Sequence, residues 1–109
     1  MSAMWTPISP EELQAEIDTG AARMLPREGA LWRFVRITPE KWQLSPWGDD
    51  GGGFWVVAVF GETCIYYNDI EHGFNESQFA QHGVIADYLC NQDKLEWVIR
   101  RMMEAIDAG

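Results

Sequence analysis

The sequence predicts a single α+β domain over residues 1–109: an N-terminal helix, an antiparallel sheet of three or four strands in meander order, and a long C-terminal helix packed across one face. Three patterns support this prediction: a helix start at Ser9, a strand, turn and strand over residues 54–67, and helical periodicity over residues 95–106. With 47% hydrophobic residues, a chain of this length can bury a core, and a second domain does not fit.

The first helix is expected to begin after Ser9. Ser9 is a favoured N-cap, Pro10 suits the first helical position, and Glu12 stands where a capping box requires a carboxylate. Apolar residues then recur every four positions along one face. Gly20 and Pro26 mark the expected end of this helix.

Two shorter elements are expected next. Residues 31–37 have the composition of a strand, which Thr38 and Pro39 should stop while opening a short helical turn that contains Trp42. Residues 45–53 are rich in glycine, proline and aspartate and are expected to form a loop.

The clearest β signal is a hairpin. Residues 54–60 are almost entirely apolar, Gly61 and Glu62 follow, and residues 63–67 form a second apolar run. A glycine at the first of two connecting positions suits a type II′ turn, because that position takes a positive φ. Since the first strand is apolar on both faces, it should be central, with a helix on one side and aromatic side chains or a partner on the other.

The last third of the chain is expected to begin with a polar, irregular segment over residues 68–81. A short strand is predicted at residues 83–86, followed by an N-cap at Asn91. The final helix is indicated by apolar residues at three- and four-residue steps, namely Leu95, Val98, Ile99, Met102, Met103 and Ile106.

Charge is the feature that says most about function. The net charge is −9, and the stretch over residues 42–93 holds eight acids and no Lys or Arg. Nucleic-acid and anionic-membrane surfaces require clustered cations, so both are excluded as expected partners. Uncompensated carboxylates instead favour rapid association with a basic protein.

The leading functional hypothesis is therefore a non-enzymatic acidic binding protein that engages a basic protein partner and uses no cofactor. Tryptophan is common at interface hot spots, and several of the six tryptophans lie near the loop over residues 45–53. The predicted partner-binding residues are Trp47, Asp49, Asp50, Asp69, Glu71 and Glu76.

The alternative is a small enzyme or a ligand- or metal-binding domain that uses the segment Tyr66–His72, where the hairpin ends. Its candidate ligand-site residues are Tyr67, Asp69, Glu71 and His72. No recognised spacing of metal ligands is present, so no metal site is expected. No catalytic residue is assigned. A homodimer that pairs the apolar faces of two sheets is a third possibility.

The cysteines and the N-terminus bear on the compartment. Met1–Pro10 has neither the basic start nor the apolar run of a signal peptide, which predicts a cytoplasmic protein. Cys64 and Cys90 are accordingly expected to be reduced, with a single bridge between them as the open alternative. Both stand beside apolar residues, which favours inert burial over pairing with His72 or His82 in catalysis.

Three stretches of sequence suggest a resemblance: Gly-Gly-Gly-Phe-Trp-Val-Val-Ala from Gly51, Tyr-Asn-Asp-Ile-Glu-His-Gly-Phe-Asn from Tyr67, and Cys-Asn-Gln-Asp-Lys-Leu-Glu-Trp from Cys90. Together they resemble small bacterial domains to which no activity is assigned. The overall type, which is short, acidic and rich in aromatic residues, resembles the immunity proteins with which bacteria neutralise basic toxins. This second resemblance extends over the whole chain and implies a partner without assigning residues.

Overall fold

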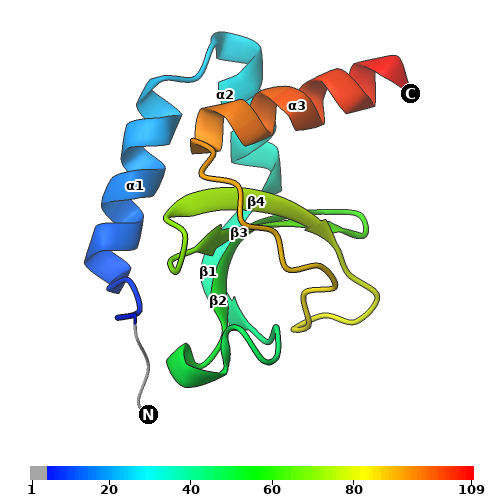
Figure 1. The fold of residues 1–109 in the computed structure, drawn as a ribbon. Helices are drawn as coiled ribbons and strands as arrows, with labels where there is room; N and C mark the ends of the chain where they lie inside the picture. The colour runs from blue at the N-terminus through cyan, green and yellow to red at the C-terminus, as the bar shows by residue number, and fades with distance from the viewer. Residues whose placement is uncertain (1–4) are drawn as a thin grey trace.

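The computed structural model describes residues 5–109, which form three helices and a four-stranded antiparallel sheet (Figure 1). The elements in chain order are α1 (Pro10–Ala22), α2 (Pro26–Val35), β1 (Arg36–Trp42), the 3₁₀ turn η1 (Asp49–Gly51), β2 (Phe54–Phe60), β3 (Thr63–Asn68), β4 (Gly73–Gln78) and α3 (Leu95–Ala108). The strands pair in the order β1-β2-β3-β4. The predicted α+β fold, its meander sheet and its packed C-terminal helix are confirmed.

Helix α1 begins where the sequence predicts. The Oγ atom of Ser9 accepts a hydrogen bond from the backbone N–H of Glu12 at 3.0 Å, and the Glu12 carboxylate accepts one from the backbone N–H of Ser9 at 3.1 Å. The helix continues past Gly20, which is buried against α3. A Cβ atom at position 20 would lie 2.8 Å from the Cβ of Leu95, so glycine lets the two helices approach closely.

The prediction of a strand over residues 31–37 is wrong, because most of this stretch belongs to α2. Pro26 occupies the first helical turn, and the side chain of Glu28 accepts a hydrogen bond from the backbone N–H of Leu25 at 2.9 Å. Glu28 and Trp32 are four residues apart, share one face of this helix, and are both buried. This tertiary burial overrides the strand-like composition.

The helical turn predicted at Thr38 and Pro39 is also wrong, since both residues lie in β1. β1 is an edge strand, where a proline without an N–H is tolerated. The pairing with β2 is irregular between Arg36 and Glu40, which leaves room for Pro39.

The predicted hairpin is confirmed. Strands β2 and β3 pair from Trp55 opposite Tyr67 to Phe60 opposite Thr63. Gly61 has a φ of 61°, as the predicted turn requires at this position.

Three predictions beyond the hairpin need correction. Residues 73–78 form β4, within the segment expected to be irregular, because their backbone pairs with all of β3. Residue Val84 makes only isolated bridges, to Gln43 and Gln81, so residues 83–86 do not form a regular strand. Helix α3 begins at Leu95 with Lys94 as its N-cap, rather than directly after Asn91.

Both faces of the sheet are covered (Figure 1). The helices pack on one face, over a core that includes Leu13, Trp32, Val57, Ile65 and Ile99. On the other face, a second core contains Trp42, Leu44, Phe54, Val56, Cys64, Tyr66 and Ile85. The sheet face away from the helices, which a homodimer would have used under the third possibility above, is covered by the chain's own loops.

The tryptophans and cysteines divide between core and surface. Trp32 and Trp42 are buried, whereas Trp47 and Trp97 are 47% and 45% exposed. Both cysteines are free. Cys64 is buried as expected, but Cys90 is exposed because it lies in the irregular segment before α3.

Within residues 5–109, none of the helices is both long and apolar enough to cross a membrane. Residues 1–4, which belong to the segment Met1–Pro10 from which the compartment was predicted, lie outside the described residues.

Candidate functional site

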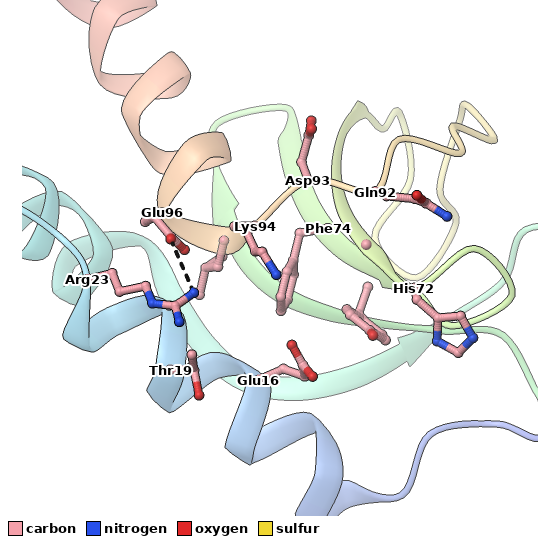
Figure 2. A pocket seen from close by; sticks show the side chains of 13 residues that line it. Glu16, Thr19, Arg23, His72, Phe74, Gln92, Asp93, Lys94 and Glu96 are labelled. Atoms are coloured by element: carbon pink, nitrogen blue, oxygen red, sulfur yellow. Dashed lines mark ion pairs between the residues drawn. The ribbon is translucent and has the colours of Figure 1, made fainter.

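A groove runs along α1 and is formed by two adjoining hollows that share Glu16, Tyr67 and His72. The larger, which we call the Asp69 hollow, has a volume of about 400 Å³ and is lined by Thr6, Pro7, Ile8, Glu12, Ala15, Glu16, Tyr67, Asp69 and His72. The smaller, the Glu96 hollow, has a volume of about 50 Å³ and lies between α1, the β3–β4 turn and the start of α3 (Figure 2).

Asp69 is the most unusual group in the groove. Its residue is only 3% exposed, and its Oδ2 atom accepts a hydrogen bond from the backbone N–H of Ile8 at 2.7 Å. Its Oδ1 atom is buried and has no hydrogen-bond partner among residues 5–109. Burial raises the pKa of Asp69, because desolvation disfavours the charged form. An incoming donor could reverse this penalty.

The turn that holds Asp69 is fixed by Asn68. The Oδ1 atom of Asn68 accepts hydrogen bonds from the backbone N–H groups of Ile70 and Glu71, at 3.0 and 3.2 Å. Its Nδ2 atom donates to the carbonyl oxygen of Leu89 at 2.9 Å. The free carboxylate oxygen beside it is therefore held on a well-anchored turn.

The other walls of the Asp69 hollow add negative charge. Glu12 and Glu16 are one helical turn apart on α1 and both line it. Burial, and to a smaller extent the neighbouring carboxylates, raise the pKa of Tyr67 to about 12, so Tyr67 presents a neutral hydroxyl at physiological pH. None of the nine described residues that line this hollow is a lysine or an arginine.

Lys41, the lysine whose charge acts on Asp69, is already engaged. The Nζ atom of Lys41 donates to the carbonyl oxygen of Gly51 at 2.7 Å and lies 5.2 Å from the centre of the Trp55 ring. Lys41 lowers the pKa of Asp69, but burial, which raises it, has the larger effect. It forms no ion pair with Asp69 within 4.0 Å in the described part of the chain.

The Glu96 hollow has mixed charge. Glu96 is 6% exposed, and its Oε1 atom has no hydrogen-bond partner in residues 5–109. Its Oε2 atom lies 4.0 Å from Nη1 of Arg23, the ion pair marked in Figure 2. Figure 2 shows Glu16 and Thr19 extending from α1 at the edge of this hollow. Because Arg23 and Lys94 also line it, this hollow is less suited to a cation than the Asp69 hollow.

Three of the four predicted ligand-site residues, Tyr67, Asp69 and His72, meet in the groove. Glu71 belongs to the same turn but does not line either hollow. His72 has a φ of 63°, a left-handed conformation that costs free energy in a non-glycine residue.

The predicted partner-binding residues fall in three places rather than one. Trp47 and Asp49 lie in the loop before β2, where Trp47 stacks on Tyr88 with ring centroids 4.6 Å apart. Asp50 is exposed beside them in η1. Glu76 is half-buried on β4, opposite Ile65. Asp69 and Glu71 belong to the β3–β4 turn.

Sequence reasoning did not single out Glu12, Glu16 or Glu96 as functional residues. A signal was present in α1, which holds four acids and no base. Two of those acids, Glu12 and Glu16, have the four-residue spacing that places side chains on one helical face. Only the fold brings that face against the turn of Asp69.

The groove contains carboxylates, an imidazole and a phenol, whereas the thiol of Cys64 lies elsewhere. No cluster of three or more His, Cys, Asp or Glu side chains able to hold a metal ion occurs within residues 5–109. Burial raises the pKa of Cys64 to about 12, and this thiol belongs to the core on the sheet face away from the helices. Such a thiol is protonated at neutral pH and is a poor nucleophile.

No family model, curated protein or solved structure matches this chain. Function is therefore inferred from the geometry and charge of the groove.

Proposed function

We propose that this protein is a non-enzymatic acidic binding protein that engages a basic protein partner, whose cationic group enters the Asp69 hollow. The observation that supports this function best is the residue Asp69, which lines the hollow together with Glu12 and Glu16 and whose Oδ1 atom is buried and unpartnered. A buried carboxylate oxygen without a donor is costly, and a cationic donor removes that cost on binding.

Charge favours encounter with such a partner. The net charge of −9 would accelerate association with a basic surface at low ionic strength. Four arginines form ion pairs on or beside the helices, at Arg23, Arg27, Arg100 and Arg101. None of these four arginines lines the Asp69 hollow or pairs with its carboxylates.

A second contact area would come from the loop before β2. Trp47 is 47% exposed and stacks on Tyr88, so its ring is held in place while one side stays available. Tyr88 contacts Phe54, which in turn stacks on Trp5 in the segment that leads to the groove. Trp47, with Asp49 and Asp50 in the same loop, is proposed to anchor the partner beside the Asp69 hollow.

An immunity protein is the specific form of this proposal that the overall type suggests. If the gene lies beside one for a basic toxin, producing both proteins together should protect the cell. The substitution Asp69→Asn should weaken that protection, and full protection by the variant would contradict the role of the groove.

Binding to defined peptides tests the proposal directly. Calorimetry would compare a peptide containing both lysine and arginine with its glutamate counterpart at two ionic strengths. We expect only the basic peptide to bind, and its Kd to rise with salt. Asp69→Asn should weaken binding by roughly tenfold to a hundredfold, the range for a hydrogen bond to a charged group.

The matched control is Glu71→Gln. It makes the same change of charge in the same turn, but Glu71 does not line the groove. This variant should bind nearly as tightly as the natural protein. Equal weakening by the two substitutions would mean that only net charge matters, and the proposed site would be wrong.

A second candidate is a domain that binds a small cationic molecule. Tyr67, Asp69 and His72 together line a hollow of about 400 Å³, which is large enough for such a ligand. A free amine that binds more tightly than any basic peptide would favour this candidate.

A further inference from the structure

We infer that the exposed face of Trp47 receives an arginine guanidinium group of the partner, which stacks flat on the indole ring. This inference rests on the proposed function and names the side chain that the loop before β2 recognises. Three features of the molecule support it: the packing that holds Trp47, the charges around it, and the shape that it presents to a partner.

The indole ring of Trp47 is held from one side. It stacks on Tyr88, with ring centroids 4.6 Å apart and ring planes inclined by only 12°. Tyr88 in turn contacts the ring of Phe54, which is fully buried. Trp47 is nevertheless 47% exposed. Since one face of its ring lies on Tyr88, the opposite face is open to solvent. We call Trp47 and Tyr88 together the Trp47 platform.

The backbone on both sides of Tyr88 is fixed by hydrogen bonds. The Tyr66 hydroxyl donates to the carbonyl oxygen of Asp87 at 3.0 Å and accepts from the backbone N–H of Leu89 at 2.7 Å. The backbone N–H of Asp87 donates to the Oγ atom of Ser77 at 3.0 Å. The Trp47 platform is therefore formed before a partner arrives, and a partner that binds there has little ordering to impose.

The charged residues next to the platform in the chain are all acidic. Asp49 and Asp50 follow Trp47 in the same loop, and Asp87 precedes Tyr88. All three are exposed, and none forms an ion pair within residues 5–109. Uncompensated carboxylates raise the local concentration of cations, so the platform favours a cationic group over a neutral one.

One lysine reaches the same loop, but on the other side of the sheet. Lys41 donates to the carbonyl oxygen of Gly51 at 2.7 Å, and its Nζ atom lies 5.2 Å from the centre of the Trp55 ring. Trp55 packs against the core under the helices, whereas Tyr88 packs against the core on the opposite sheet face. Lys41 therefore does not occupy the platform.

Trp97 is exposed to a similar extent but lacks these features. It is 45% exposed on α3, and within residues 5–109 its ring stacks on no other aromatic ring. Lys94, Arg100 and Arg101 lie three or four residues from it, so cations of the chain already surround it. Exposure of a tryptophan alone therefore does not define the proposed site, and Trp97 provides a matched control.

The shape of the platform favours arginine over lysine. Because its two rings are nearly parallel, it presents one flat face rather than a cage of inclined rings. A guanidinium group is planar and weakly hydrated, and it stacks on aromatic faces. An ammonium group is compact and strongly hydrated, so it gains less from a flat face that stays partly in water. Arginine is also the commoner cation in contacts with tryptophan.

The experiment varies the arginine of the basic peptide that tests the proposed function. Calorimetry on the whole protein would compare this peptide with versions in which arginine is replaced by lysine or by citrulline. Lysine keeps the charge without the plane, and citrulline keeps the plane without the charge. We expect arginine to bind roughly threefold more tightly than lysine, within the range of a cation–π contact at an exposed site. The citrulline version should bind most weakly.

Substitutions at the two tryptophans locate the preference. Trp47→Leu keeps an apolar side chain over Tyr88 but removes the aromatic face, so it should abolish the preference for arginine over lysine. The matched control Trp97→Leu should retain the full preference. Trp47→Phe keeps a smaller ring and should retain part of it. Should Trp47→Leu not fold, as circular dichroism would show, Trp47→Phe provides the second test.

The outcomes separate this inference from the proposed function. If lysine binds as tightly as arginine while Asp69→Asn still weakens both, the inference is wrong and the proposed function stands. If the preference survives unchanged in the Trp47 variants, arginine is recognised elsewhere and the inference is wrong. If citrulline binds as tightly as arginine, the platform recognises a plane without regard to charge, which also contradicts it. If none of the peptides binds, both proposals fail.

Discussion

Two buried carboxylates, Glu28 in α2 and Asp69 in the β3–β4 turn, have opposite surroundings. Glu28 is 1% exposed, and its Oε2 atom accepts a hydrogen bond from Nε of Arg100 at 2.7 Å while Oε1 accepts one from the backbone N–H of Leu25 at 2.9 Å. Asp69 is 3% exposed and has one partner, the backbone N–H of Ile8. Both oxygens of Glu28 therefore accept a hydrogen bond, whereas only one oxygen of Asp69 does.

This difference shows in the ionisation of the two groups. The hydrogen bond from Arg100 lowers the pKa of Glu28, because it favours the charged form. Burial raises the pKa of Asp69, since the hydrogen bond from Ile8 and the charge of Lys41 offset only part of the desolvation. Burial alone therefore does not mark a binding residue in this protein. The two carboxylates differ in their hydrogen bonds: that of Glu28 joins two helices, whereas that of Asp69 keeps an unpartnered oxygen, and we propose that only the second takes part in binding.

The largest expected effect comes from removing Arg100 from its ion pair with Glu28. Arg100→Met would leave the buried carboxylate of Glu28 without its cation, which is strongly destabilising in buried pairs. We expect Tm to fall by roughly 10 °C, measured by thermal unfolding. The double variant Glu28→Met with Arg100→Met should recover much of the loss, because an apolar pair leaves no buried charge. An unchanged Tm in the single variant would show that water replaces the arginine.

Removing the charge of Asp69 is expected to change Tm by a smaller amount and in the opposite direction. Its pKa in the folded protein lies above the unfolded value, so the folded state keeps the proton longer as pH rises. The contribution of Asp69 to the free energy of unfolding therefore falls as pH rises through the interval between the two pKa values. Asp69→Asn should raise Tm by roughly 4 °C at pH 7. The difference should vanish near pH 3, where both states are protonated.

Glu28 gives the control for this pH dependence. Its folded pKa lies below the unfolded value, so its contribution is present above the unfolded pKa and is lost as pH falls through the folded one. Glu28→Gln should therefore lower Tm at pH 7 and approach the natural protein on acidification. If Asp69→Asn behaves in the same way, the carboxylate of Asp69 is stabilised rather than strained, and it would not be open to a cation.

Much of the fold follows from local sequence. Three features depend on residues close together in the chain: the cap at Ser9, the hairpin around Gly61 and the periodicity of α3. The sequence predicts all three, because each pattern lies within one helix or one pair of strands. Helix α2 could not be predicted in this way. Its composition is strand-like, and its buried Glu28 is satisfied by Arg100, which is 72 residues away in the chain. Strand β4 was missed for the same reason, because its pairing with β3 is tertiary.

The site was predictable only in part. Tyr67, Asp69 and His72 follow one another at the end of the hairpin, where polar residues indicate a binding segment. Ile8, 61 residues earlier in the chain, decides which oxygen of Asp69 has a partner. The wall of the hollow opposite Asp69 forms only because α1 lies against the turn. Such contacts leave no pattern in one stretch of sequence.

The smallest expected effect concerns the turn that carries the incomplete carboxylate. His72 has a φ of 63°, a conformation that glycine adopts without strain. His72→Gly relieves that strain, although glycine also gains freedom in the unfolded chain, so we expect Tm to rise by only roughly 2 °C. The imidazole lines the groove, and its loss should weaken binding of the basic peptide even though the fold is more stable. His72→Asn separates the two effects, since asparagine tolerates this conformation but removes the ring. A variant that is more stable and binds equally well would show that His72 serves the turn alone. Binding in the groove would then depend on its carboxylates and on Tyr67.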